Sequence, residues 1–334
     1  MEKAAVIILN YNGLAFLEKF LPGVVKHSKG HHIYIADNSS TDNSVAFITN
    51  NFPDLSLLVL DKNYGFCGGY NRALSQVDEE YCILLNSDIE VTENWIEPLL
   101  ETISKNDKVA AVQPKILSHH EKDRFEYAGA AGGFLDKFGY PFCRGRIFDH
   151  LEKDEGQYDD EREIFWATGA CMMLKKSLFL RHGGFDERFF AHMEEIDLCW
   201  RFKNDGFKVM YCPSSKIYHV GGGTLPKNNP KKVFLNFRNS LFLLVKNLPE
   251  NQLFYKIFIR LTLDFPAAFT FFFKGSIKSF FMVIWAHFHL YMHLPQLIKG
   301  RKKQLPNPKS HQGYYARSIV AAYFIGGKKK FTEL

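Results

Sequence analysis

An apolar run in the N-terminal half of the chain ends abruptly in acidic residues. The run covers residues 82–85, and Asn86, Asp88 and Glu90 follow it at every second position. This pattern is typical of a buried strand that delivers carboxylates to the open edge of an α/β sheet, where ligands bind. Carboxylate oxygens, together with phosphates, are ligands of Mg²⁺ and Mn²⁺. The spacing therefore indicates a metal site, with a helix cap or a solvated turn as the alternative.

Three earlier apolar runs also end in polar residues. They cover residues 4–9, 31–36 and 56–60. We expect a helix after each run: over residues 14–27, from a cap at Thr41 or Asp42 through Asn50, and from residues 68–72 onward. Because the carboxyl ends of parallel strands share one sheet edge, this alternation predicts an α/β fold with a mostly parallel central sheet flanked by helices and a polar site along that edge.

The pattern changes after the fourth strand. A helix over residues 93–104 and a strand over 109–112 precede an irregular segment, residues 115–163, which is rich in Gly and aromatic residues. A segment of this length inside a domain is typical of a functional loop or a mobile lid. Further strands are expected over residues 165–174, 208–212 and 217–220, with Pro213 ending the second, and a helix with acids in its first turn begins at Glu194.

The C-terminal third has a different composition. Many of the 32 Phe fall between Phe234 and Phe288, among Lys, Arg and His. Lys256, Arg260 and Asp264 recur every fourth residue, which predicts one polar stripe on an otherwise apolar helix that Pro266 breaks. We therefore divide the chain into a sheet domain, residues 1–224, and an amphipathic helical region, residues 225–334.

Such helices favour binding in the plane of an anionic membrane. Residues 279–298 carry no formal charge, but four residues count against a helix that spans the membrane: His287, His289, His293 and Pro295. A soluble helical or oligomer interface is the remaining alternative.

Composition narrows the class of protein. A chain of 334 residues with 46% hydrophobic and 23% charged residues can bury the core of one large domain with an attachment. The six cysteines form no CxxC pair and the N-terminal apolar run is too short for a signal peptide, which indicates a cytoplasmic protein. The net charge is +6, but the basic residues cluster with the Phe-rich helices, so nucleic-acid binding is not expected. The spacing of Cys199, Cys212 and His219 is poor for zinc.

Five motifs in order over residues 4–220 resemble family 2 inverting glycosyltransferases, and more narrowly the rhamnosyltransferase-like branch that builds bacterial polysaccharides. They lie at residues 6–13, 37–42, 63–71, 84–88 and 184–198. The resemblance implies a GT-A fold, a dTDP- or UDP-sugar donor, and Mg²⁺ or Mn²⁺ bridging the diphosphate. It also implies transfer of a sugar, with rhamnose favoured, to a hydroxyl of a lipid-linked saccharide at the inner face of the cell membrane.

The resemblance assigns roles to residues along the predicted edge. The nucleoside pocket would be lined by Asn10, Tyr11, Asn12 and Asp37, and the nucleotide and sugar subsite by Asn63, Gly65, Asn71 and Asn86. Asp88 matches the last acid of the DxD motif, and His219 matches a position that can complete the metal shell. Trp166 and Gly169 match positions near the acceptor or sugar. The alternatives are an Asx turn for Asp37, a structural His219 and a core Trp166.

Two positions depart from the family pattern. The family has Glu-Asp where this chain has Glu194-Glu195. Glu195 matches the general base, but its extra methylene leaves Glu194 and Asp197 as alternatives. Asn86-Ser87-Asp88 replaces Asp-x-Asp and supplies fewer carboxylates.

Two other functions compete with sugar transfer. A sugar-phosphate nucleotidyltransferase should carry a Gly-rich phosphate loop with Arg and Lys after the first strand, and residues 10–13 do not form one. A non-catalytic nucleotide-sugar-binding protein would have the same spacing of motifs, so the spacing does not exclude it.

Overall fold

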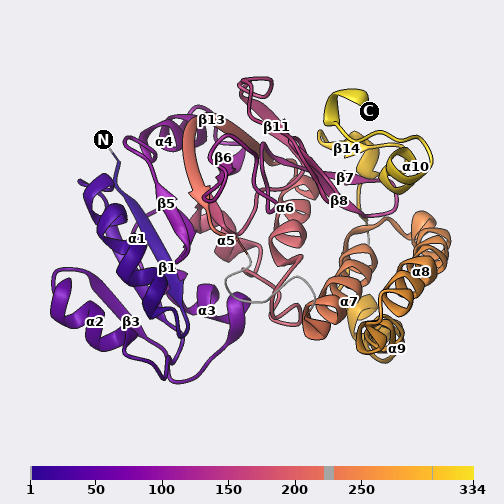
Figure 1. The fold of residues 1–334 in the computed structure, drawn as a ribbon, viewed down its shortest axis with the longest axis horizontal. Helices are drawn as coiled ribbons and strands as arrows, with labels where there is room; N and C mark the ends of the chain where they lie inside the picture. Colours follow the sequence, from indigo (N-terminus) through magenta and orange to yellow (C-terminus); the bar gives the residue numbers. More distant parts are fainter. Residues whose placement is uncertain (1, 222–228, 303) are drawn as a thin grey trace.

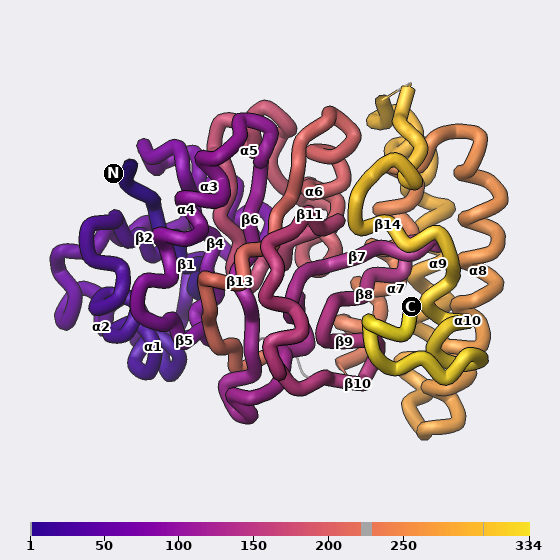
Figure 2. The backbone as a smooth tube through the Cα atoms, turned by 90° about the horizontal axis from the view of Figure 1, so that it is seen from above, coloured from indigo at the N-terminus to yellow at the C-terminus, as the bar shows by residue number. Residues whose placement is uncertain are grey.

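The computed structural model describes residues 2–221, 229–302 and 304–334 (Figure 1). The boundary expected between residues 224 and 225 lies outside the described residues. Along the long axis of the molecule the chain runs from the N-terminal strands and helices at one end to three long helices at the other (Figures 1 and 2).

The central sheet is formed by strands from the first two thirds of the chain, in the order β11-β13-β6-β12-β4-β1-β2-β3, with β5 paired to β13. Their bounds are β1 Ala4–Asn10, β2 His32–Asp37, β3 Ser56–Val59, β4 Tyr81–Asn86, β5 Ile89–Val91, β6 Val109–Ser118, β11 Arg162–Ile164, β12 Cys171–Lys175 and β13 Lys208–His219. Strands β1 to β4 are parallel, as the alternation of strands and helices predicts.

The prediction of a mostly parallel sheet is wrong for the sheet as a whole, which is mixed, although β6 and β13 also pair in parallel. β12 runs antiparallel to both β4 and β6, and β11 and β5 run antiparallel to β13. A short apolar strand that follows a long insertion carries no sequence signal of its direction. β13 also continues past Pro213, because a register shift between Cys212 and Lys216 removes the need for a ladder hydrogen bond there.

Helices cover both faces of this sheet. They are α1 Leu14–His27, α2 Ser44–Asn51, α3 Gly65–Leu74, α4 Glu97–Ser104, α5 Lys176–Arg181 and α6 Glu194–Asn204. Alternate residues of β1 enter opposite cores, with Ala5 and Ile7 in one and Val6 and Ile8 in the other. This two-sided burial explains why the N-terminal strands read as continuous apolar runs.

The segment expected to be a loop or lid forms a second sheet, in the order β10-β9-β8-β7-β14. Its strands are β7 Gly133–Asp136, β8 Pro141–Cys143, β9 Arg146–Ile147, β10 His150–Leu151 and β14 Tyr314–Tyr315. β14 comes from the C-terminal tail, and its parallel pairing with β7 joins segments that are far apart in the sequence (Figure 2). The sequence did not predict this sheet, because its strands are too short to show a periodicity. In addition β14, which pairs with β7, lies almost two hundred residues further along the chain.

Three long helices, α7 Pro230–Asn247, α8 Glu250–Phe273 and α9 Ile277–Lys299, form the far end of the molecule (Figure 2). They are followed by the short elements η1 Pro308–Ser310, α10 Ile319–Phe324 and η2 Phe331–Glu333. The expected break at Pro266 is wrong, because α8 continues through this residue. Buried Asp264 and Ala268 on either side hold the helix in place, which outweighs the loss of one hydrogen bond.

The polar stripe of α8 faces the protein rather than its surroundings. Arg260 Nε donates to Asp264 Oδ1 at 3.0 Å, and His287 Nε2 of α9 lies 3.2 Å from Asp264 Oδ2. The aromatic face is the exposed one, with Phe258 65% and Phe273 81% exposed. Lys256 and Arg260 of this stripe are therefore buried in the protein and cannot meet a membrane surface. None of the helices in the described ranges is both long and apolar enough to cross a bilayer.

Candidate active site

Two polar side chains, one at the end of β1 and one at the end of β2, are joined by a hydrogen bond. Asn10 and Asp37 are register partners and both are fully buried. Asn10 Nδ2 donates to Asp37 Oδ2 at 2.9 Å and to Ser40 Oγ at 3.1 Å, and the Ser40 N–H donates to Asp37 Oδ1 at 2.8 Å. Asp37 thus bonds the backbone of its own turn three residues on, rather than two as in an Asx turn, and it lies at the sheet edge expected to take a nucleoside.

The turn after β1 is shaped by Asn12, which has a left-handed φ of 50°. Its Oδ1 accepts from the Thr41 N–H at 2.7 Å, and its own N–H donates to Ser40 Oγ at 2.9 Å. These bonds tie the first turn to the second. Tyr11 lies between Asn10 and Asn12 in the chain and is 48% exposed, so its ring is free to meet a ligand.

The third turn is attached to the second through Asn38, a residue that the sequence analysis did not assign to the site. Asn38 Nδ2 donates to Asn63 Oδ1 at 3.1 Å and to the Gly65 carbonyl at 3.0 Å. Gly65 begins α3 with φ 68°, and a Cβ there would lie 2.7 Å from the Phe190 ring. Only glycine fits both the conformation and the close approach.

Asp88, two residues beyond β4, lies next to His219, the last residue of β13. Asp88 Oδ1 lies 3.2 Å from His219 Nε2, and His219 Nδ1 lies 3.2 Å from Glu126 Oε2. All three residues are buried. Glu126 belongs to the segment expected to be irregular, and no motif marks it. Asn86 ends β4, and its N–H donates to the Ala170 carbonyl at 2.9 Å.

The charges of this trio set its pKa values. Burial alone would raise the pKa of Asp88, but His219 outweighs it and holds the pKa below its ordinary range. Burial would lower the pKa of His219, but Asp88 and Glu126 raise it to about 10. Glu90 points elsewhere, to His119 at 2.8 Å and Lys122 at 2.7 Å. Within the described ranges no group of three or more His, Cys, Asp or Glu side chains could hold a metal ion, including the cysteines considered for zinc.

The acids of α6 follow a strained loop. Phe190, His192 and Met193 have φ of 64°, 71° and 72°, a left-handed conformation that costs free energy in non-glycine residues. The Phe190 carbonyl accepts from the N–H groups of Phe66 and Cys67 at 3.1 and 3.3 Å. The loop that leads to the acids therefore contacts the first turn of α3, which belongs to the predicted donor side.

Glu194 and Glu195 both resist ionisation. Burial and the neighbouring Glu195 raise the pKa of Glu194 well above its ordinary value. Glu195 is partly exposed as a residue, but its Oε2 is buried, and burial raises its pKa to about 7. Among the described residues, Oε2 of each has no hydrogen-bond partner. Two adjacent acids without a counter-charge are suited to proton transfer near neutral pH.

Asp197 is different, because it is fully buried and paired. It accepts from Arg201 Nε at 2.9 Å, Lys246 Nζ at 2.8 Å and Asn247 Nδ2 at 2.8 Å. Burial opposes ionisation, but Lys246 and Arg201 outweigh it and lower the pKa of Asp197. A carboxylate saturated with donors binds α6 to α7 and is a poor base.

Asn239 of α7 holds the strained loop and was not found from the sequence. Its Nδ2 donates to three carbonyls, those of Phe189 at 2.9 Å, Ala191 at 2.8 Å and His192 at 2.7 Å. Because Asn239 is fully buried, its bonds supply the loop carbonyls with the hydrogen-bond partners that water would otherwise provide. A lone Asn on an amphipathic helix carries no signal of this role.

The remaining predicted residues lie at the edges of the site. Asn71 of α3 donates from Nδ2 to the Phe185 carbonyl at 2.9 Å, and its Oδ1 accepts from the Phe185 N–H at 2.9 Å. Trp166 is only 5% exposed and donates to the Phe134 carbonyl at 2.9 Å, so it has almost no free face for a sugar ring. This placement favours its alternative as a core residue. Gly169 is buried, and a Cβ there would lie 2.8 Å from Phe66.

Solved structures with a similar fold are glycosyltransferases. The protein superposes on GalNAc-T7, solved with UDP, GalNAc and Mn²⁺, with a TM-score of 0.56 and 15% identity, over 75% of this chain and 49% of that one. It superposes on the mannosyltransferase PcManGT of Pyrobaculum calidifontis, solved with GDP-Man and Mn²⁺, with a TM-score of 0.52 and 12% identity, over 85% and 86%. At this identity the likeness shows the fold, which is GT-A.

Sequence relatives agree with the fold. The N-acetylglucosaminyl-diphospho-decaprenol L-rhamnosyltransferase of Mycobacterium tuberculosis is 28% identical over 64% of this chain and 75% of its own length. The rhamnosyltransferase WbbL of Escherichia coli K12 is 24% identical over 64% and 82%. The family model described as glycosyl transferase family 2 matches residues 5–183, more than half of the chain. The chain therefore belongs to glycosyltransferase family 2 and is a GT-A glycosyltransferase.

Proposed function

We propose that the protein transfers a sugar, with inversion, from a nucleoside diphosphate sugar to a hydroxyl of a lipid-linked saccharide. The observation that carries this proposal is the unpaired acid pair of α6, whose leading loop contacts the first turn of α3. The names of both relatives support rhamnose as the sugar, and the name of the Mycobacterium tuberculosis relative supports a lipid diphosphate saccharide as the acceptor. Similarity to the same branch favours dTDP over UDP as the nucleotide.

Glu195 is the base in this proposal. Inversion in one step needs a group that takes the acceptor hydroxyl's proton while its oxygen bonds to the anomeric carbon and the bond to the diphosphate breaks. With a pKa of about 7, Glu195 is partly ionised at neutral pH and can accept that proton. Burial and the neighbouring Glu195 raise the pKa of Glu194 well above its ordinary value, and its carboxyl belongs to a buried residue. Asp197 is neutralised by Lys246 and Arg201. Neither Glu194 nor Asp197 is therefore as well suited as Glu195 to act as the base.

The donor would lie along the carboxyl ends of β1, β2 and β4. In this assignment the nucleoside contacts Tyr11 and the turns held by Asn10, Asn12 and Asp37. The diphosphate and sugar lie toward Asn63, Gly65, Asn71 and Asn86. Gly169, packed on Phe66, would border the sugar.

Asp88 and His219 would hold a divalent cation, Mg²⁺ or Mn²⁺. The donor set fits: the Asp88 carboxylate and the His219 ring lie 3.2 Å apart, and the cation would take the place of the proton that Asp88 and Glu126 hold on His219. Since they supply only two protein ligands, the donor's phosphate oxygens would supply others. When bound, such a cation neutralises the charge that develops on the departing diphosphate. The Mn²⁺ in two structures of similar fold supports this assignment.

A direct test uses purified full-length protein, a panel of dTDP-, UDP- and GDP-sugars, and a lipid diphosphate saccharide acceptor, with Mn²⁺, Mg²⁺ or chelator. We expect release of nucleoside diphosphate and a glycosylated lipid with inverted anomeric configuration. Release of pyrophosphate would indicate a nucleotidyltransferase instead. Donor binding without turnover under all conditions would contradict enzymatic transfer.

The exposed face of α8 and α9 would dock the enzyme on the inner face of the cell membrane. Aromatic side chains cover both helices, and an exposed apolar patch of this kind marks an interaction surface. Lys274 and Lys278 are exposed where the two helices meet, which suits an anionic bilayer. The acceptor's lipid would be in the same bilayer.

Vesicle sedimentation tests this docking. We expect binding to vesicles with anionic phospholipid, and about tenfold weaker binding for Phe258→Ser or Phe273→Ser. Val59→Ser, which removes an exposed apolar side chain from β3 at the other end of the molecule, should bind as the parent does. Equal binding of all variants would contradict the proposed surface.

A further inference from the structure

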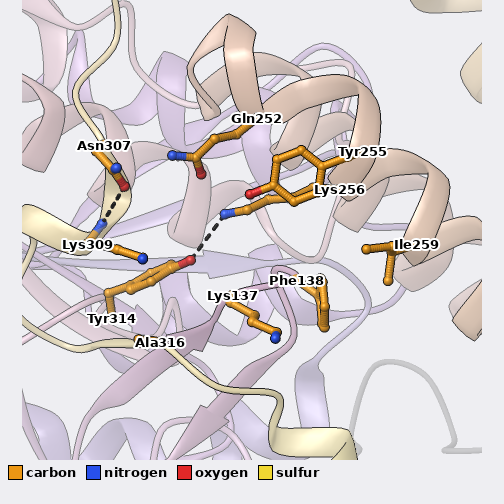
Figure 3. A pocket seen from close by; sticks show the side chains of 10 residues that line it. All are labelled: Lys137, Phe138, Gln252, Tyr255, Lys256, Ile259, Asn307, Lys309, Tyr314 and Ala316. Atoms are coloured by element: carbon orange, nitrogen blue, oxygen red, sulfur yellow. Dashed lines mark hydrogen bonds between the residues drawn. The ribbon is translucent and has the colours of Figure 1, made fainter.

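A pocket of about 320 Å³ opens between α8, the turn after β7 and the C-terminal segment around η1. Lysines from all three segments border it: Lys137, Lys256 and Lys309 (Figure 3). The other polar residues of its wall are Gln252, Tyr255, Asn307 and Tyr314. None of these elements contributes to the candidate active site.

The lining of the pocket is basic and contains no Asp or Glu. Within the described ranges none of the three lysines forms an ion pair. Lys256 is only 3% exposed, and its Nζ donates to Tyr314 Oη at 3.1 Å, which uses one of three N–H donors. Figure 3 shows the ammonium and the hydroxyl pointing toward each other inside the pocket.

The nearest buried acid is already occupied. Asp136 Oδ1 accepts from the N–H groups of Phe138 and Tyr140, both at 2.8 Å, and Oδ2 accepts from the Ile319 N–H at 2.9 Å. It therefore organises the turn that carries Lys137 and does not pair with the lysines. A buried ammonium without a paired carboxylate is costly, because charge leaves water without compensation.

The titration of Lys256 agrees with this picture. Burial lowers the pKa of Lys256 to about 8; the charge of Asp136 opposes the shift, and Lys309 and Lys137 add to it. Repulsion between ammonium groups would be relieved by an anion placed among them.

We propose that this pocket binds a phosphate group, as a phosphate ester or a diphosphate. Three ammonium groups from three segments match a multiply charged anion, and Asn307, Gln252 and Tyr314 can hydrogen-bond its remaining oxygens. Phe138 and Ile259 in the wall of the pocket offer apolar contact to whatever carries the phosphate. The source is either a phospholipid headgroup or a soluble phosphate compound.

Site-specific labelling tests the pocket directly, without an activity assay. Full-length protein is treated at pH 8 with an amine acylating reagent, with and without inorganic pyrophosphate and with chelator present, and labelled lysines are located by peptide mass spectrometry. We expect pyrophosphate to protect Lys256 and Lys309 and to leave Lys274 unprotected. Identical labelling of all three with and without pyrophosphate would overturn the proposal.

Variants separate this site from the catalytic one. Lys309→Gln changes an exposed side chain and should fold normally, whereas Lys256→Met keeps the buried apolar stem. Each should weaken pyrophosphate binding measured by calorimetry at least about tenfold, the value of one charge-assisted contact. Lys274→Gln, at the residue that follows α8 and outside the pocket, is the matched control. An equal loss of pyrophosphate affinity in the control variant would overturn a specific site. The measurement does not depend on sugar transfer, so it tests this pocket separately from the proposed function.

The source of the phosphate follows from a second measurement. Vesicles of phosphatidylcholine with phosphatidylglycerol are compared for Lys309→Gln and Lys29→Gln, the latter an exposed lysine between α1 and β2 that lies outside α8, α9 and the pocket. A greater loss of vesicle binding for Lys309→Gln identifies a lipid headgroup. Equal vesicle binding, with pyrophosphate protection retained, identifies a soluble phosphate compound.

Discussion

The two acidic regions of the active site bury their carboxylates in opposite electrostatic settings. Asp88 lies 3.2 Å from His219, which keeps its pKa low despite burial. Glu195 adjoins another acid and forms no ion pair with any residue that the structure describes, and burial raises its pKa to about 7. One carboxylate stays charged and suits a cation and diphosphate, whereas the other can gain and lose a proton. The same side-chain chemistry thus serves two roles because the neighbours differ.

The largest expected effect comes from removing the titrating acid. Glu195→Gln keeps the shape of the side chain but cannot accept a proton, so we expect kcat to fall about 10³-fold. Steady-state release of nucleoside diphosphate measures this effect. The control is Glu194→Gln, which changes the adjacent acid and should retain most activity. If Glu194→Gln is the more damaged variant, the base assignment is reversed.

Removing the charged acid should have the next largest effect. Asp88→Asn keeps the size of the side chain but loses its charge, so we expect about 10²-fold weaker transfer. The loss should be accompanied by weaker donor binding and a higher Mn²⁺ requirement, both measurable by titration. Glu90→Gln, two residues along, is the control, because Glu90 pairs with His119 and Lys122. A donor affinity unchanged in Asp88→Asn would remove Asp88 from the site.

Disturbing the loop that carries the base should have a smaller effect. Asn239→Ala removes the bonds to the Phe189, Ala191 and His192 carbonyls, so we expect kcat to fall about tenfold through misplacement of Glu195. The same substitution should change the burial of Glu195 and therefore its pKa, so the acidic limb of the pH–rate profile should shift. A loss of stability alone would not shift this limb. An unshifted limb would show that Asn239 acts only on folding.

The smallest expected effect at neutral pH, about a twofold loss at pH 7, is the pH dependence of the parent enzyme. Glu195 must be ionised to act, so kcat/KM should rise with pH and reach half of its plateau at about pH 7. Below that pH it should fall toward a tenfold loss per unit. Rates of the parent and of Glu194→Gln across pH 5 to pH 9 measure this profile. Activity that is flat between pH 5 and pH 7 would exclude a base with the raised pKa.

Much of the catalytic half could be predicted from the sequence. β1 to β4 and α1 lie close to their expected ranges, because alternating apolar runs and polar turns are local signals. The sequence also indicated Asn10, Asp37 and Asp88 as strand-end residues. It did not indicate Glu126, Asn38 or Asn239, whose contacts with His219, Asn63 and the loop before α6 depend on long-range packing.

The C-terminal helices show the limit of periodicity most clearly. The spacing of Lys256, Arg260 and Asp264 correctly indicates one polar stripe, but not which side of α8 meets the protein. Burial of Arg260 against Ser240, Asp264 and the turn at Gly139 turned that stripe inward and left the aromatic face exposed.

By itself the sequence determined where carboxylates emerge from strands, since a strand's period and its turn residues are set within a few positions. Only the tertiary structure decided which of them are charged. The pKa of a carboxylate depends on which distant groups share its low-dielectric surroundings, such as His219 beside Asp88. Packing brings those groups together, and no local pattern records it.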